Sequence, residues 1–218
     1  MSYKIDVVFP KSAEQYISLQ CNSKLSDYTE CPELAQLHEL LSTKQPKRVL
    51  ELGAGLGRGS VFLKRRYNWN ETEFFLADGN SGTQQIAGIH YQLEPGFYNS
   101  MVATCDFCLA NGIAKDKLYL INLEAAEIPE AQFDLCFSIK SIGFHWPINE
   151  YLSRLRDKIA QGATLLFELR NPQGYTPERV VRLSKYVKMQ LEGIDSEVYK
   201  VVRYDEGKQF PMLVLERC

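Results

Sequence analysis

Glycines gather at one point of the chain, where a short apolar run gives way to a helical pattern. The string from Val49 to Gly57 reads Val-Leu-Glu-Leu-Gly-Ala-Gly-Leu-Gly, so glycine recurs at every second position. Glycine lets another molecule approach the main chain closely, and the N–H groups that begin a helix attract an anionic group. The string therefore predicts a ligand-binding turn between a strand and a helix. The alternative is a glycine turn that merely ends the strand.

An acidic residue, Asp78, follows the next apolar run, Phe74 to Ala77. A carboxylate at the carboxyl end of a strand is placed to accept hydrogen bonds from two neighbouring hydroxyl groups of a ligand. The alternative is a turn or cap residue, a common use of aspartate.

A histidine, His145, lies in the segment from Lys140 to Leu152, which reads Lys-Ser-Ile-Gly-Phe-His-Trp-Pro-Ile-Asn-Glu-Tyr-Leu. Imidazole is the usual side chain for taking a proton near neutral pH, and the chain has only three histidines. His145 is therefore a candidate general base. The alternative is a histidine that packs between its aromatic neighbours and caps a helix.

Short apolar runs separated by helical segments must position these residues. Five such runs predict buried parallel strands, and two more, joined only by residues 205–211, predict a hairpin. We therefore expect an α/β fold with a seven-stranded, mostly parallel sheet that ends in an antiparallel hairpin. Helical spacing also recurs at residues 12–20 and 32–42. The predicted strands are Arg48–Leu52, Phe74–Ala77, Leu118–Ile121, Phe133–Ile139, Ala163–Leu169, Val198–Tyr204 and Met212–Glu216.

Composition limits the classes of function. The formal net charge of the 218 residues is -2, which gives no general attraction for nucleic acid or for an anionic membrane. No signal pattern and no apolar stretch of membrane-spanning length appears, so we expect a cytoplasmic protein. Cys105 and Cys108 form a lone C-x-x-C in a predicted helix from Ser100 to Asn111, and we interpret them as structural rather than metal-binding.

The glycine string resembles the cofactor loop of class I S-adenosylmethionine-dependent methyltransferases. The dinucleotide pattern G-x-G-x-x-G would need a glycine where Arg58 stands, whereas G-x-G-x-G preceded by Glu51 is similar to the methyltransferase motif. The antiparallel hairpin is also typical of that family. The length of 218 residues, the apolar content of 45% and the lack of a repeat or linker predict a single domain over residues 1–218. The resemblance covers its predicted Rossmann-like core (47–218), which follows an N-terminal helical preface (1–46).

The resemblance also implies which residues bind S-adenosylmethionine. The glycine loop would hold its methionine part, Asp78 its ribose, Asn122 its adenine, and the backbone after Ser138 would cover the methionine end. The implied cofactor residues are Glu51, Gly53, Ala54, Gly55, Gly57, Asp78, Gly79, Asn122, Leu123, Ser138 and Ile139.

The segment around His145, with Tyr98 and Asn99, resembles a family of sugar O-methyltransferases from bacterial surface-polysaccharide clusters. This implies O-methylation of a small polar acceptor such as a sugar, nucleotide sugar or polysaccharide-linked group, with His145 as base. The implied acceptor residues are His90, Tyr98, Asn99 and Trp146. The residues predict no metal site, and a homodimer stays open.

The same residues disfavour some other functions and leave others open. Methylation of nucleic acid or protein is disfavoured by the balanced charge and by Ser138-Ile-Lys-Ser141, which stands where an Asn/Asp-Pro-Pro-Tyr string would be expected. A nicotinamide-dependent oxidoreductase conflicts with the glycine spacing and with the hairpin. Methylation of another small molecule and a non-catalytic binding module stay open. A basic run after Pro177 could receive a phosphate, or could be a solvated helix face. It comprises Arg179, Arg182, Lys185 and Lys188.

Overall fold

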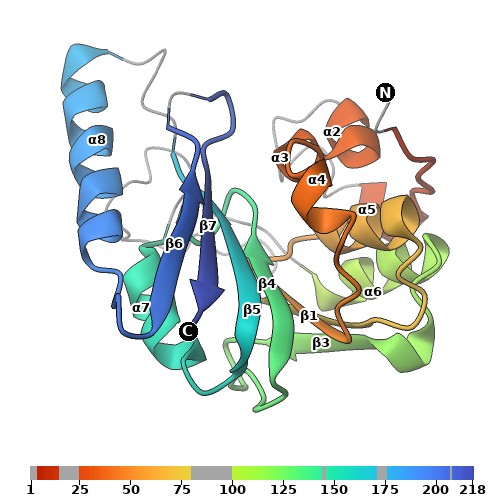
Figure 1. Cartoon of the computed structure of the whole chain (residues 1–218). Coiled ribbons are helices and arrows are strands. Elements are labelled where there is room, and N and C mark those ends of the chain that lie inside the picture. The colour runs from red at the N-terminus through yellow and green to blue at the C-terminus, as the bar shows by residue number, and fades with distance from the viewer. Residues whose placement is uncertain (1–3, 15–24, 80–99, 144–145, 171–175, 207) are drawn as a thin grey trace.

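The structure is a computed structural model, which describes residues 4–14, 25–79, 100–143, 146–170, 176–206 and 208–218. These residues build one central sheet with helices on both of its faces (Figure 1). The strands are β1 (Arg48–Leu52), β2 (Glu73–Asp78), β3 (Leu118–Asn122), β4 (Phe133–Ser138), β5 (Ile159–Glu168), β6 (Tyr199–Tyr204) and β7 (Met212–Arg217). The helices are α2 (Leu25–Glu30), α3 (Pro32–Ala35), α4 (His38–Leu41), α5 (Arg58–Tyr67), α6 (Met101–Ala110), α7 (Ile148–Leu155) and α8 (Pro177–Glu192), with a 3₁₀ turn η1 (Lys115–Lys117).

The seven strands follow the order β3-β2-β1-β4-β5-β7-β6. The first five pair in parallel, and β7 pairs antiparallel with both β5 and β6. The predicted sheet and its C-terminal hairpin are therefore confirmed. Because β1 lies between β2 and β4, the carboxyl ends of these three strands meet at one edge.

Most predicted strand bounds lie within one residue of those observed, but β5 begins at Ile159 rather than Ala163. Its pairing with β4 shifts register between Phe133 and Leu135, which face Ile159 and Thr164. Gly162, with φ +75°, lies in this irregular stretch. The pattern of apolar residues did not reveal the first part of the strand, because residues 160–162 there are partly or fully exposed.

The prediction of one helix over 32–42 was wrong, because the chain forms α3 and α4 with a break at Gln36 and Leu37. The Leu37 N–H bonds to the carbonyl of Leu34, three residues back, and this tighter turn interrupts the α-helical ladder. Of the predicted helix 12–20, residues 12–14 lie in an observed helical turn at 11–14, and 15–20 lie outside the described part.

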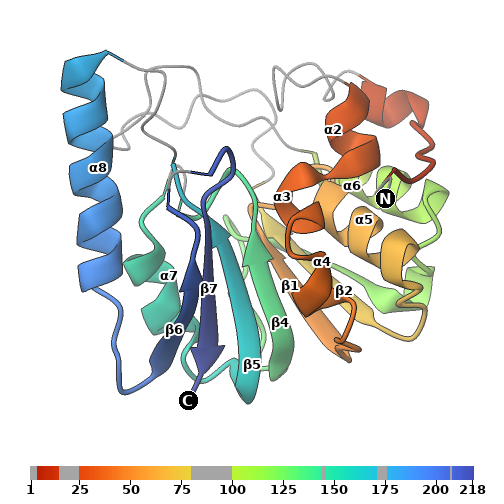
Figure 2. The same ribbon diagram turned by 45° about the horizontal axis from the view of Figure 1, so that its top comes forward.

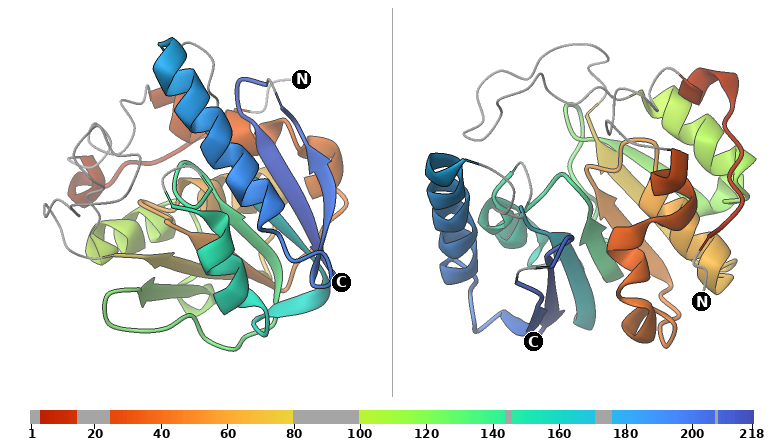
Figure 3. Two further views of the ribbon diagram at one scale, coloured as in Figure 1. Left: turned by 90° about the vertical axis from the view of Figure 1, so that its left-hand side faces the viewer. Right: turned by 90° about the horizontal axis from the view of Figure 1, so that it is seen from above.

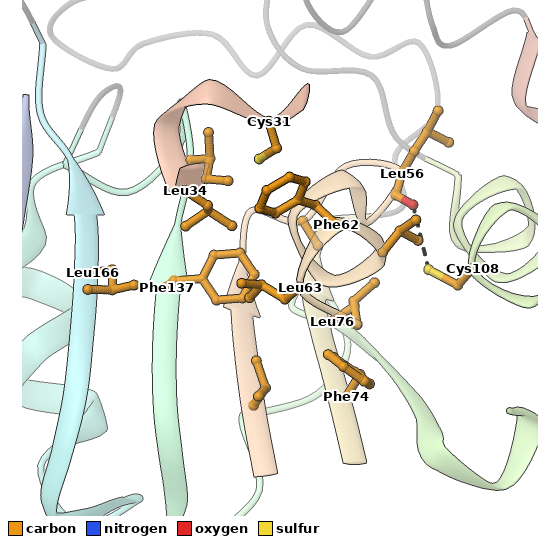
Figure 4. Close-up of a cluster of buried hydrophobic side chains, with 14 of the residues drawn as sticks. Cys31, Leu34, Leu56, Phe62, Leu63, Phe74, Leu76, Cys108, Phe137 and Leu166 are labelled. Atoms are coloured by element: carbon orange, nitrogen blue, oxygen red, sulfur yellow. Dashed lines mark hydrogen bonds between the residues drawn. The ribbon is translucent and has the colours of Figure 1, made fainter. Parts of the chain in front are cut away.

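Each face of the sheet carries its own apolar core. Helices α2 to α6 lie over one face, and α7 and α8 lie over the other (Figure 3). On the first face, Phe62 and Leu63 of α5 pack against Phe74, Phe137 and Leu166 of three strands (Figure 4). None of the helices in the described residues is long and apolar enough to cross a membrane.

Asn111, fully buried, pins the N-terminal segment to the end of α6. Its Oδ1 accepts the N–H of Val8 at 2.8 Å, and its Nδ2 donates to the carbonyls of Val8 and Phe107, each at 2.8 Å. Two hydrogen bonds to Val8 thus fix the path of the segment that precedes α2, and the bond to Phe107 holds the side chain against α6.

We predict that Asn111→Ala destabilises the fold by about 1 to 3 kcal/mol, because it removes the hydrogen bonds of a fully buried side chain, including both that hold the main chain of Val8. Thermal or urea unfolding monitored by circular dichroism measures the change. Ser153→Ala, which removes an exposed hydroxyl bonded to its own helix, is the control. Equal stability of the two variants would contradict the role assigned to Asn111.

Candidate active site

The glycine loop after β1 is packed so tightly that two of its glycine positions have no room for a side chain. Gly53, Gly55 and Gly57 have φ values of +62°, +53° and +80°, which favour glycine. A Cβ on Gly53 would lie 1.9 Å from the Ser141 Oγ, and one on Gly57 would lie 2.5 Å from Leu76 Cδ2. The alternation of glycines therefore meets both a backbone requirement and a packing requirement.

Helix α6 supports this loop from below. Thr104 donates its hydroxyl to the Gly55 carbonyl at 2.7 Å, and the Cys108 thiol lies 3.7 Å from the Leu56 carbonyl (Figure 4). Burial raises the pKa of the Cys108 thiol well above its ordinary value, so it stays protonated. Cys108 is thus a core residue beneath the loop, in agreement with its predicted structural role, and sequence reasoning missed Thr104.

Asp78, at the end of β2, joins the glycine loop to its own strand. Its Oδ2 accepts the N–H of Gly55 at 2.6 Å, and its Oδ1 accepts the N–H of Gly79 at 2.7 Å. Burial raises the pKa of Asp78 to about 6, with Glu124 adding to the rise and the two N–H donors opposing it. A carboxylate has about four acceptor sites, so these bonds leave capacity for hydroxyl groups of a ligand.

Glu51 lies beneath the loop, on the face covered by α5. Its Oε2 accepts the N–H of Ser60 at 3.0 Å and the Ser60 hydroxyl at 2.6 Å. Burial raises the pKa of Glu51 to about 7, although the bonds from Ser60 and the charge of Arg58 oppose the rise. The structure thus ties this predicted cofactor residue to the first turn of α5, while Ala54 is buried in the loop above.

At the end of β3, Asn122 and Leu123 form a turn against β2. The Leu123 N–H donates to the Asp78 carbonyl at 2.9 Å, and the Asn122 Oδ1 accepts the N–H of Glu124 at 3.0 Å. Glu124 also lies beside Gly79: a Cβ built on Gly79 would be 3.5 Å from the carboxyl carbon of Glu124. These contacts bring the predicted adenine residues beside the predicted ribose residues, and they add Glu124, which the sequence did not single out.

The segment after β4 is held to β1 by the hydroxyl of Ser138. It donates to the Leu52 carbonyl at 2.7 Å and accepts the N–H of Ile142 at 2.9 Å. The buried residues Ser138 and Ile139 therefore stand next to the glycine loop. Trp146, which is half-buried, forms an isolated β-bridge with Ile142 of this segment.

Gln190 of α8 fixes the same segment from the opposite face of the sheet. Fully buried, it donates from Nε2 to the Gly143 carbonyl at 3.2 Å and accepts the Ile148 N–H on Oε1 at 2.9 Å. Residues 144 and 145 lie between these anchor points. Gln190 occupies a position of α8 at which the spacing of the helix leads one to expect an apolar residue. This polar residue on the buried face was the signal in the sequence that could have identified it.

A cluster of charged groups lies under the two loops. The Arg58 guanidinium contacts both carboxylate oxygens of Glu33, at 2.9 and 3.2 Å, and Lys140 Nζ lies 3.2 Å from Glu33 Oε1. The Lys140 N–H donates to Glu168 Oε2 at 3.1 Å. Sequence reasoning missed Glu33 and Glu168, although Glu168 lies inside the apolar run Leu-Leu-Phe-Glu-Leu, where a charge is unusual.

The two carboxyl groups of this cluster have opposite pKa shifts. Burial alone would raise the pKa of Glu33, but the charges of Arg58 and Lys140 outweigh it and hold the pKa below its ordinary value. Burial and the charge of Glu33 raise the pKa of Glu168 to about 8, against the opposing effect of Lys140. Glu33 is therefore ionised at neutral pH, and Glu168 is largely protonated.

The remaining predicted residues fall into two groups. His90, Tyr98, Asn99 and His145 lie outside the described residues. In the basic run, Arg182, Lys185 and Lys188 are exposed on α8, and Lys188 pairs with Glu192, as expected of a solvated face. Within the described part of the chain, no three histidine, cysteine, aspartate or glutamate side chains are grouped to hold a metal ion.

We predict that the stability of the protein without ligands falls as the pH rises from about 4 to about 8, the interval between the ordinary pKa values of three buried carboxyl groups and the highest of their folded values. Glu51, Asp78 and Glu168 retain protons in the folded state that the unfolded chain has released, so unfolding is favoured as the pH approaches their folded pKa values. Glu168→Gln should keep an acceptor for the Lys140 N–H and weaken this pH dependence. Thermal unfolding across the pH range tests this, with Glu71→Gln as an exposed control, and an unchanged slope in Glu168→Gln would contradict it.

No family model and no curated protein matches the sequence, but the fold is similar to solved methyltransferase structures. One is an O-methyltransferase of Streptomyces achromogenes involved in tomaymycin synthesis, in complex with SAM, at TM-score 0.53 and 16% identity over 97% of this chain and 91% of the other. A SAH-bound methyltransferase of Podospora anserina has TM-score 0.55 and 12% identity, covering 96% and 88%. A Mesorhizobium loti S-adenosylmethionine-dependent methyltransferase has TM-score 0.56 and 10% identity, covering 85% and 98%. The chain therefore has the Rossmann-like fold of the class I methyltransferases.

Proposed function

We propose that the chain is an S-adenosylmethionine-dependent methyltransferase that methylates an oxygen of a small polar acceptor. The observation that carries the proposal is the hydrogen bond from the Gly55 N–H to Asp78, which brings a glycine loop and an acidic strand end together. These lie at the carboxyl edge of a sheet whose strand order is that of the methyltransferase fold. Solved structures of this fold hold SAM and SAH, which supports the same cofactor here.

The residues at this edge suit the parts of that cofactor. The loop backbone at Gly53, Ala54, Gly55 and Gly57 would lie against the methionine part, because a side chain there would take up the space. Asp78 and Gly79 would bond the ribose, and Asn122 and Leu123 would border the adenine. Ser138 and Ile139 would cover the methionine end, with Glu51 holding α5 in place below. When bound, S-adenosylmethionine supplies an activated methyl group.

The acceptor would enter over the segment that carries His145 and Trp146. Transfer to a hydroxyl requires loss of its proton, and we assign His145 as the base that takes it. His90, Tyr98 and Asn99 are the further proposed contacts of the acceptor. A sugar, nucleotide sugar or polysaccharide-linked group is our proposed acceptor, and the net charge of -2 favours such a small molecule over nucleic acid.

Two measurements test this function against the alternative of a non-catalytic binding module. Calorimetric titration with S-adenosylhomocysteine should give saturable heat for a methyltransferase. Transfer of a labelled methyl group to a panel of nucleotide sugars, oligosaccharides and other small hydroxyl compounds should then identify the acceptor class. Binding without transfer to any acceptor would favour the binding module, and transfer only to non-carbohydrates would contradict the sugar proposal.

We predict that Gly55→Ala abolishes detectable binding of S-adenosylhomocysteine while the fold persists. Gly162→Ala is a matched control, because Gly162 also has positive φ and a Cβ there would meet no atom within 4 Å. Both variants carry the left-handed strain of about 1 to 2 kcal/mol, but only one places a methyl group in the loop. Calorimetry and thermal unfolding on both variants check this. Normal binding by Gly55→Ala would mean that the loop does not hold the cofactor.

We predict that His145→Ala lowers turnover by about 10²- to 10⁴-fold, the range for one acid–base group, and leaves cofactor affinity nearly unchanged. Turnover of the native enzyme at saturating cofactor should fall at low pH with an apparent pKa of about 6 to 7, since protonated imidazole is not a base. Steady-state rates and unfolding curves are the measurements. A variant that keeps most of its turnover, or loses it only in step with stability, would show that His145 is a packing residue.

A further inference from the structure

The N-terminal helix α3 contributes a buried charge to the edge of the sheet where the proposed cofactor site lies. Glu33 is fully buried on α3, between Cys31 and Leu34, which pack against Phe62 of α5 (Figure 4). Helix α3 lies beside the N-terminal end of α5, at the carboxyl edge of the sheet (Figure 2). A part of the chain that precedes the sheet thus contacts residues next to the proposed site.

One carboxylate holds a residue from each of two loops. Arg58 follows Gly57 directly and begins α5, and Lys140 is the second residue after β4. Glu33 accepts two hydrogen bonds from Arg58 and forms an ion pair with the Nζ of Lys140. The Arg58 side chain is 9% exposed and that of Lys140 is 28% exposed, so water screens the first pair little and the second only in part.

The loops that these cations belong to are in direct contact. A Cβ on Gly53 would overlap Ser141, the neighbour of Lys140, so the position of one loop limits the position of the other. Lys140 has φ +54°, an uncommon conformation for a residue with a side chain, which persists only when its surroundings impose it. The contacts of Lys140 with Glu33 and Glu168 are such constraints.

Stability alone is a poor reason for burying these charges. Removing charges from water costs free energy that a buried pair recovers only with good geometry, and well-packed apolar residues often serve stability equally well. What a buried carboxylate with two cationic partners provides is a fixed mutual position of the groups it binds. Here those groups are the first residue after the glycine loop and the residue before Ser141.

We propose that Glu33 is a positioning residue of the cofactor site: by binding Arg58 and Lys140 it sets the separation of the glycine loop and the segment after β4. The inference rests on the proposed function, since the space between these loops is where the methionine end of the cofactor would lie. It makes α3 a functional part of the site, although no residue of α3 is proposed to touch the cofactor.

The test compares Glu33→Gln with Asn111→Ala, which loosens the N-terminal segment at a point away from the loops. We measure thermal stability, affinity for S-adenosylhomocysteine by calorimetry, and hydrogen exchange of residues 53–58 and 139–143 without ligand. Glu33→Gln should weaken affinity about tenfold or more, the scale of coupling between sites, and speed exchange in both loops. Asn111→Ala should lower stability yet change affinity by less than about twofold and leave loop exchange as in the native chain.

Lys140→Met extends the test and covers the case in which Glu33→Gln fails to fold. It keeps the pair of Glu33 with Arg58, and should weaken affinity and speed exchange in residues 139–143. In a double variant with Glu33→Gln the two effects on affinity should be less than additive, because each substitution alone already removes the same contact between Glu33 and Lys140. The inference is overturned if loop exchange and affinity in folded Glu33→Gln or Lys140→Met match the native chain, or if they change only as in Asn111→Ala. A native chain that gives no heat of binding refutes the proposed function, and loop exchange then decides the positioning role by itself.

Discussion

Parallel pairing of β1 with both β2 and β4 is the constraint on which the rest of the structure depends. It brings the ends of three strands that are far apart in sequence to one edge, so that Leu52, Asp78 and Ser138 become neighbours. The hydrogen bonds that follow are local consequences of this pairing. Ser138 bonds to the end of β1, and Asp78 bonds to the loop that β1 feeds. The helices on both faces keep the strands aligned by burying the alternate residues of each.

Close packing at this edge explains why the loop contains several glycines rather than one. Because Gly53 has no side chain, Ser141 can pack against it. In the same way, Leu76 and Cys108 pack against Gly57. Between them the main chain is anchored by Thr104 and Asp78, so its N–H and carbonyl groups have set directions before any ligand arrives. Such preorganisation reduces the entropy that binding must overcome.

The sequence predicted most of the fold, because strands buried on both faces leave uninterrupted apolar runs and a short connection forces a hairpin. It also predicted that Gly53 and Asp78 lie at the ends of two neighbouring strands, as they do at β1 and β2, while their role in binding stays a prediction. It could not predict Glu33 or Gln190, because each acts through a partner that only the tertiary fold brings near. The break between α3 and α4 was missed for a related reason: the spacing of Leu34, Leu37 and Leu41 satisfies a continuous helix as well as a broken one.

The outer hairpin strand, β6, ends the sheet and presents backbone groups that could template a further strand. Its exposed residues include Val201 and Val202, which alone would invite pairing with another copy. They are flanked by the exposed side chains of Lys200 and Arg203, and the register with β7 shifts between Val201 and Arg203. A second chain aligned along this edge would have to follow an irregular ladder and cover the charged side chains of Lys200 and Arg203. The bulge therefore acts as a barrier to edge-to-edge aggregation, at the side of the sheet farthest from β3.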